Sequence, residues 1–114
     1  MEHRASPRTT ADLRAELHKT RGKRSVARIK NLSTLGLFLA TKPEAYRLYE
    51  SLTITVDLTT GFTLKGKVVR TQENGIAVEL DTTEDTLGQA ARLMHAVKRR
   101  QAQADIKSSL LVNE

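Results

Sequence analysis

Residues 31–40 read Asn31-Leu32-Ser33-Thr34-Leu35-Gly36-Leu37-Phe38-Leu39-Ala40, a short polar turn followed at once by an apolar run. The side chains of Asn31 and Ser33 can hydrogen bond to nearby backbone groups and so shape a turn. Gly36 permits a backbone angle or a close approach that a side chain would block. The apolar run predicts a buried strand over residues 36–40.

Alternating apolar and polar residues predict two strands before this turn. In the first strand the apolar positions have the two-residue period of a half-buried strand, and they are Leu13, Ala15 and Leu17. A turn around Gly22 leads to a second strand over residues 24–32, anchored by Val26 and Ile29. Its imperfect alternation indicates a β-bulge.

Three further strands are expected after residue 50. The clearest alternation in the chain is that of Leu52, Ile54, Val56 and Leu58. Strands over residues 62–71 and 75–80 follow, and Asn74-Gly75 between them is a strong hairpin signal. Several short strands with turns between them and one sizeable helix favour an antiparallel barrel or sandwich.

Two segments have helical features. A short helix is predicted over residues 42–50, with Pro43 at its first position and Glu44 in its first turn. A longer helix, capped by Asp81 or Thr83, follows the last strand. Its apolar positions at three-and-four spacing are Leu87, Ala90, Ala91, Met94 and Val97, and we expect Leu87 and Met94 to face the barrel.

The excess positive charge lies at the front of the chain. Of a net charge of +6 in 114 residues, all is carried by residues 1–30, which hold nine Lys and Arg against three acids. The rest of the chain is neutral. A one-sided field of this kind attracts an anionic partner. Nucleic acid, acidic lipid and a phosphate-bearing small ligand all remain open on charge alone.

A second polar cluster, His3-Arg4-Ala5-Ser6-Pro7-Arg8, places two arginines four residues apart on a segment without apolar periodicity. An Arg-x-x-x-Arg pair followed by (Asp/Asn)-x-Ser-x-x-Gly resembles the PilZ domain family, in which both motifs bind the bacterial second messenger cyclic di-GMP. The resemblance covers roughly residues 4–96. The matching positions are Arg4 and Arg8 in the first motif and Asn31, Ser33 and Gly36 in the second.

The resemblance implies a fold, a ligand and a partner. The implied fold is a mainly β, six-stranded antiparallel PilZ-like split β-barrel with a C-terminal α-helix. The implied ligand is cyclic di-GMP, and the implied partner is a downstream effector protein. The ligand-binding residues carried over are Arg4, Arg8, Asn31, Ser33 and Gly36, and His3, directly before Arg4, is a further candidate. Asn31 stands where the family often has Asp, so a carboxylate for the guanine N–H groups is missing and affinity is expected to fall.

The chemistry of the ligand fits these residue types. A cyclic dinucleotide offers guanine edges with two adjacent acceptors, two anionic phosphates and flat aromatic faces. Arginine can form a fork to guanine, pair with phosphate and stack on a base. Asn31 can donate and accept at a base edge, whereas Ser33 can bond a base or a backbone group.

The expected organisation has three parts. Residues 1–11 are interpreted as a flexible N-terminal arm, residues 12–100 as the barrel with its helix, and residues 101–114 as a frayed tail. Ligand bridging the arm and the barrel would order the arm and present a new surface to the effector.

The sequence favours a sensor over an enzyme. No phosphate-binding glycine loop of the P-loop type or nucleophile motif is present, and His3, His18 and His95 lack metal-ligand spacing. We therefore expect no catalytic residues, metal or cofactor. The absence of cysteine, of a long apolar stretch and of an apolar leader leads us to expect a cytoplasmic protein without membrane insertion.

Two alternatives stay open. One is a PilZ-like protein-interaction module that binds no nucleotide. The other is a basic nucleic-acid-binding β-barrel, which we favour less because only four aromatic residues are available for stacking.

Overall fold

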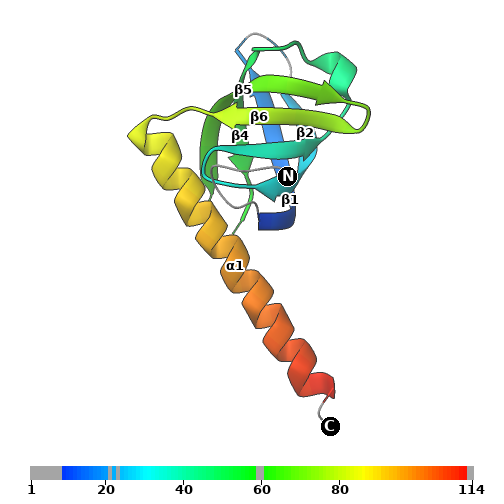
Figure 1. Ribbon diagram of the computed structural model, residues 1–114, viewed down its shortest axis with the longest axis vertical. Coiled ribbons are helices and arrows are strands. Elements are labelled where there is room, and N and C mark those ends of the chain that lie inside the picture. Colours follow the sequence, from blue (N-terminus) through cyan, green and yellow to red (C-terminus); the bar gives the residue numbers. More distant parts are fainter. Residues whose placement is uncertain (1–8, 21, 23, 59–60, 113–114) are drawn as a thin grey trace, which may run out of the picture.

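The computed structural model describes residues 9–20, 22, 24–58 and 61–112, which form six strands, a short 3-10 helix and one long α-helix (Figure 1). In chain order the elements are β1 (Thr9–Lys19), β2 (Arg24–Leu32), β3 (Gly36–Ala40), η1 (Pro43–Ala45), β4 (Ser51–Val56), β5 (Phe62–Gln72), β6 (Gly75–Leu80) and α1 (Glu84–Val112).

The six strands close into a barrel in the order β1-β2-β3-β6-β5-β4, and every neighbouring pair is antiparallel. Pairing of β1 with β4 completes the ring, so the barrel has no free strand edge. This confirms the predicted six-stranded antiparallel barrel with a C-terminal helix. The predicted hairpin at Asn74-Gly75 joins β5 to β6.

The barrel core follows from the alternation of the strands. Successive side chains of a strand point to opposite faces, so the apolar positions of all six strands meet inside. The fully buried residues include Ala15, Leu17, Ile29, Leu39, Ile54, Leu64 and Ile76. The first-strand positions Leu13, Ala15 and Leu17 are buried, as predicted. Of the two predicted anchors of β2, Ile29 is buried but Val26 is exposed, because residues three apart point to opposite faces of a strand.

The predicted bulge in β2 is present. The register between β2 and β3 shifts between Ile29 and Asn31, and the register between β1 and β2 shifts between Thr10 and Leu13. Bulges bend a strand and redirect its side chains. Both irregularities lie at the end of the barrel that carries the Asn31–Gly36 turn.

The prediction of a helix over residues 42–50 was wrong. Only Pro43–Ala45 forms one turn of 3-10 helix, and the backbone is already extended at Tyr46. Tyr46 is buried, and its hydroxyl shares a hydrogen bond of 2.6 Å with the Ser25 hydroxyl. A continuous helix is therefore replaced by an irregular segment whose aromatic anchor packs into the core, while Leu48 and Tyr49 stay exposed.

The helix α1 begins where the sequence predicted, but it presents a different face. Thr83 is the cap, because its hydroxyl accepts the backbone N–H of Thr86 at 3.3 Å. The face buried against the barrel consists of Thr86, Ala90, Leu93 and Val97. Leu87 and Met94, which were predicted to face the barrel, are only partly buried. The observed inward positions lie about one residue earlier in the sequence. Leu93, which lies outside the predicted apolar positions, is fully buried.

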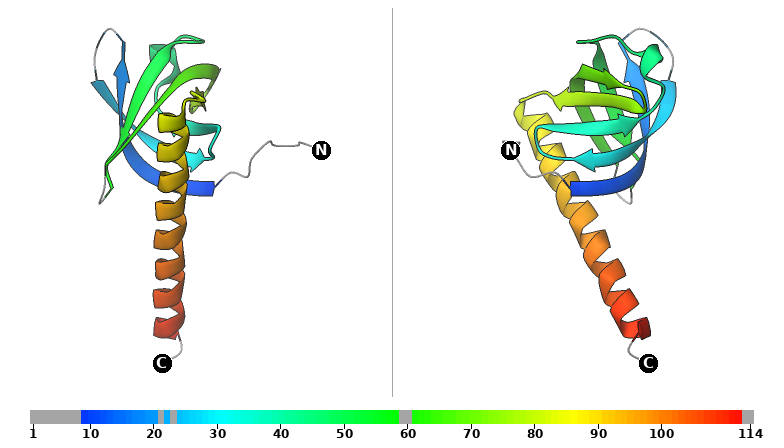
Figure 2. Two further views of the ribbon diagram at one scale, coloured as in Figure 1. Left: turned by 90° about the vertical axis from the view of Figure 1, so that its left-hand side faces the viewer. Right: turned by 45° about the vertical axis from the view of Figure 1, so that its right-hand side comes forward.

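The ends of the elements differ from the expected boundaries. Thr9, Thr10 and Ala11 belong to β1 rather than to the arm, and α1 continues past Arg100 to Val112. The second half of α1 extends beyond the barrel in all views (Figures 1 and 2). Across the part of the chain that the structure describes, no helix is both long and apolar enough to cross a membrane.

Candidate ligand-binding site

The Ser33 hydroxyl shapes the turn between β2 and β3. Its oxygen accepts the backbone N–H groups of Leu35 at 3.2 Å and Gly36 at 3.1 Å. The same hydroxyl donates to the Gly36 carbonyl at 3.3 Å, and the Ser33 N–H donates to that carbonyl at 2.8 Å. Ser33 is buried, and a hydroxyl has one donor and two acceptor positions. The internal contacts therefore occupy it fully.

Gly36 allows β3 to approach β6 closely. A Cβ at this position would lie 2.8 Å from the carbonyl oxygen of Val78, closer than real Cβ atoms come. The Leu80 N–H donates to the Leu35 carbonyl at 2.9 Å and fixes the turn to the end of β6. The Asn31–Gly36 turn, which we call the corner, is thus fixed against the end of β6, the strand that precedes α1.

Asn31 differs from the other two residues of this motif. The residue is half-buried, and its side-chain oxygen is shielded from solvent without a hydrogen-bond partner among the described residues. Burying an acceptor without a partner is unfavourable, by about 1–3 kcal/mol. This oxygen is therefore suited to accept from a ligand.

The start of β1 lies beside this corner. Thr9 is opposite Leu32, and Thr10 is opposite Asn31 in the antiparallel register. The chain therefore enters the barrel, at Thr9, beside the Asn31–Gly36 corner. The predicted site residues His3, Arg4 and Arg8 lie outside the described residues.

Asp12 on β1 forms ion pairs with two cations of β2, Arg28 and Lys30. The Arg28 guanidinium donates to the Asp12 carboxylate at 2.8 Å and to the Asp12 carbonyl at 3.1 Å, and the Lys30 ammonium lies 3.1 Å from the same carboxylate. The hydrogen bond from Arg28, with a second one from Lys30, lowers the pKa of Asp12 to about 2. The same contact raises the pKa of Arg28. Two cations therefore share one acid, which leaves this surface positive.

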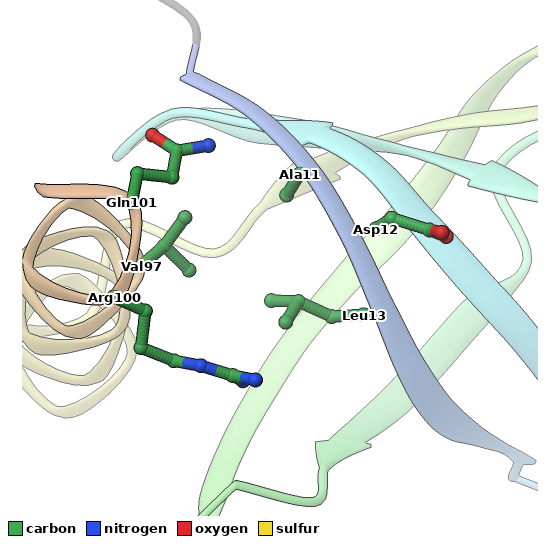
Figure 3. Close-up of a pocket in the computed structure, with 6 residues that line it drawn as sticks. All are labelled: Ala11, Asp12, Leu13, Val97, Arg100 and Gln101. Carbon is green, nitrogen blue, oxygen red and sulfur yellow. The ribbon is translucent and has the colours of Figure 1, made fainter. Parts of the chain in front are cut away.

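A pocket of about 230 Å³ separates the start of β1 from α1. Figure 3 shows Val97 and Leu13 facing one another across it, with Arg100 along one side and Asp12 directed away from the helix. Gln101 also lines the pocket, and its amide donates to the Thr10 carbonyl at 2.8 Å. Arg100 and Gln101 were not identified from sequence, because no local pattern places a helix position beside a strand 91 residues away.

Within the described residues no three His, Cys, Asp or Glu side chains gather as metal ligands. The corner combines the buried side-chain oxygen of Asn31, which has no partner among the described residues, with a turn fixed by hydrogen bonds and with the cations Arg28 and Lys30 on β2. These groups can bind an anionic ligand that carries N–H donors.

Comparison with known proteins supports a family assignment. The sequence matches the PilZ domain family over residues 2–96. A search of curated proteins found no match. The fold is similar to that in a crystal structure of the PilZ domain of CeSA from a cellulose-synthesizing bacterium, with a TM-score of 0.71 and 18% identity over 82% of this chain and 99% of that one.

A second solved structure has the same fold. It is the Bacillus subtilis inhibitor of motility (MotI/DgrA), with a TM-score of 0.67 and 20% identity. The match covers 90% of this chain but 53% of that protein. Because the family match spans most of the sequence and the barrel agrees with both structures, the chain belongs to the PilZ domain family, a family of cyclic di-GMP-binding adaptor domains.

Proposed function

We propose that this chain is a receptor for cyclic di-GMP that binds the dinucleotide between its N-terminal segment and the Asn31–Gly36 corner, and then regulates a downstream protein. The observation that carries this proposal is the register of β1 and β2. Thr9 and Thr10 lie opposite Leu32 and Asn31, so the segment with Arg4 and Arg8 is joined to the barrel at the corner itself.

Chain connectivity lets both arginines reach the corner. Arg8 is one peptide bond from Thr9, and consecutive Cα atoms are about 3.8 Å apart. Arg4 is five residues from Thr9, a span of at most about 18 Å even when extended. A dinucleotide at the corner is therefore within reach of both guanidinium groups.

Each corner residue has its own part in binding. The Asn31 side-chain oxygen, buried without a partner in the described structure, would accept from the N–H groups of a guanine edge. The hydroxyl of Ser33 and the missing side chain of Gly36 keep the turn in a shape that admits a flat base. Arg4 and Arg8 would bind guanine acceptors and phosphate, and His3 would stack beside them.

Binding would be transmitted through β1 to α1. The Thr10 carbonyl accepts from Gln101 on the helix, and Thr10 is opposite Asn31. A ligand that holds the N-terminal segment over the corner would change the surface that the barrel and helix present together. An effector protein in the cytoplasm that recognises this surface would complete an adaptor function without catalysis.

Calorimetric titration of the whole chain with cyclic di-GMP tests the proposal. Binding at micromolar or lower Kd is expected, and Arg8→Ala or Asn31→Ala should weaken it roughly tenfold or more. Arg14→Ala is the matched control, because Arg14 is an exposed arginine of β1 outside both motifs. Unchanged affinity in the Arg8→Ala protein would refute the proposed role of the arginine motif.

The same titration separates the alternatives. A protein-interaction module without nucleotide binding gives no heat with cyclic di-GMP. A nucleic-acid-binding barrel instead binds generic DNA or RNA, with an affinity that falls steeply as salt rises. The small number of aromatic residues, four in the whole chain, favours the small ligand, because few bases could stack.

A further inference from the structure

Three exposed apolar residues lie on adjoining segments near the Lys19 end of β1. Leu48 and Tyr49 follow η1, and Val69 lies on β5; their exposed fractions are 54%, 72% and 39%. The Tyr49 N–H donates to the carbonyl of Val68 at 2.6 Å, which places Tyr49 beside Val69. We call Leu48, Tyr49 and Val69 the apolar tip. Exposed apolar groups that cluster indicate an interaction surface more often than single ones do.

The backbone holds the tip in an unfavourable conformation. Tyr49 has φ of 66°, in the left-handed region that bulky residues rarely adopt. Two backbone hydrogen bonds hold Tyr49 against β5. The Tyr49 N–H donates to the Val68 carbonyl, and the Val68 N–H donates to the Glu50 carbonyl at 3.0 Å. The Glu50 carboxylate also accepts the Arg47 N–H at 3.0 Å. The local structure therefore keeps an aromatic ring in solvent although burial would be favourable.

Positive charge predominates around the tip. The segments that meet here are tied together by the Lys19–Glu50 ion pair at 3.5 Å, by a hydrogen bond from Lys19 to the Ala45 carbonyl and by the Ser25–Tyr46 hydrogen bond. Their described charged residues are the cations Lys19, Arg24, Lys42, Arg47 and Arg70 and the acids Glu44, Glu50 and Glu73. Lys19 and Glu50 neutralise one another, and the other charged residues named here are four cations and two acids, so the net charge of this end is positive.

The size of the tip decides between two kinds of partner. A stable protein interface buries about 800 Å² on each partner, which three side chains on one tip do not supply. A membrane surface requires less apolar area, because anionic headgroups add attraction to nearby cations. Tyrosine is also favoured at the level of the headgroups, where its ring is half in hydrocarbon and its hydroxyl in water.

We propose that the apolar tip docks the domain on anionic phospholipid membranes, with Leu48, Tyr49 and Val69 in the interface and Arg47 and Arg70 among the headgroups. The domain lies on the surface in this arrangement and does not span the bilayer. In Figure 1 the segment with η1 lies at the end of the molecule away from the C-terminal end of α1, so α1 would project away from the lipid. The proposal does not depend on the binding of cyclic di-GMP.

Sedimentation of the whole chain with vesicles tests this surface. Vesicles of equal parts phosphatidylglycerol and phosphatidylcholine should bind the chain, whereas vesicles of phosphatidylcholine alone should bind it weakly. The double variant Leu48→Ser/Tyr49→Ser should lower partitioning roughly tenfold or more. Val26→Ser is the matched control, since Val26 is equally exposed, at 54%, on the outer face of β2.

A spectroscopic reporter gives a second readout. The chain has no tryptophan, so Tyr49→Trp adds a single indole at the tip. Its emission should shift to the blue on addition of the mixed vesicles and return when salt screens the cations. Circular dichroism spectra like that of the parent show that each variant is folded.

Two results would overturn the proposal. One is equal vesicle binding by the parent and the Leu48→Ser/Tyr49→Ser protein. The other is an absence of binding to either kind of vesicle, which would point to a protein contact at the tip instead.

Discussion

The side-chain amide of Gln101, past the middle of α1, donates a hydrogen bond of 2.8 Å to the backbone carbonyl of Thr10 at the start of β1. Thr10 is in turn the register partner of Asn31, whose buried side-chain oxygen has no hydrogen-bond partner among the described residues. The contact therefore joins the helix to the edge of the candidate site, across a pocket that includes Arg100.

Removal of this contact should loosen the helix. In a Gln101→Ala protein, backbone amides of residues 98–103 should exchange with deuterium faster than in the parent, because a hydrogen bond worth about 1 kcal/mol is lost. Gln103→Ala, an exposed glutamine of the same helix, is the control. Identical exchange in all three proteins would mean that the contact does not restrain α1.

The hydroxyl of Ser33 should stabilise the barrel independently of any ligand. Ser33→Ala leaves the N–H groups of Leu35 and Gly36 without their acceptor, and we expect the free energy of unfolding to fall by about 1–3 kcal/mol. Urea denaturation measures this change. Thr34→Ser in the same turn should have a much smaller effect, and comparable losses in the two variants would contradict the assigned role.

Two glycines should respond in opposite ways to alanine. A Cβ at Gly75 would collide with the Leu39 carbonyl and lie 2.8 Å from the Phe38 ring, so Gly75→Ala should destabilise the protein by about 3 kcal/mol. At Gly88, inside α1, nothing lies within 4 Å of the added atom. Gly88→Ala should stabilise by about 0.5–1 kcal/mol through better helix propensity. Thermal unfolding of both variants checks the pair, and a loss of stability in Gly88→Ala would contradict the open space around that position.

The pairing of Asp12 with Arg28 should make stability depend on pH in the acid range. The folded-state pKa of Asp12 is lowered from 3.8 to about 2, so the folded state favours the carboxylate. The resulting stabilisation is present above pH 3.8 and is lost as the pH falls through about 2. The Tm of the parent should exceed that of Asp12→Asn at neutral pH, and the difference should shrink over this window. A Tm difference that stays constant down to pH 2 would exclude this linkage.

The fold could be predicted from sequence because most strands alternate clearly, although the alternation of β2 is imperfect and Val26 is exposed rather than inside. Leu13, Ala15 and Leu17 are two residues apart and therefore share one face of the strand, and this apolar face is the one that is buried. The buried face of α1 was harder to predict, because apolar residues at positions 87, 90, 91, 93, 94 and 97 cover more than one face of the helix. Only packing on the barrel selects the face of Ala90, Leu93 and Val97.

Some features depend on contacts far apart in sequence. The 42–50 segment has local helical signals at Pro43 and Glu44, but burial of Tyr46 against Ser25 overrides them. At the candidate site, Asn31, Ser33 and Gly36 stay predicted ligand-binding residues, and the structure describes the separate local environment of each. The link from Gln101 to Thr10 has no local signal at all.

The length of β1 has a physical consequence for regulation. Thr10 at one end contacts the helix and the motif corner, whereas Lys19 at the other end is paired with Glu50. At about 3.3 Å per residue these positions are at most roughly 30 Å apart, nearly four times the distance of about 8 Å over which physiological salt screens charge. A nucleotide bound at the corner would therefore leave the electrostatic potential at the apolar tip unchanged. Under both proposals, the domain would bind the messenger while it stays on the bilayer surface.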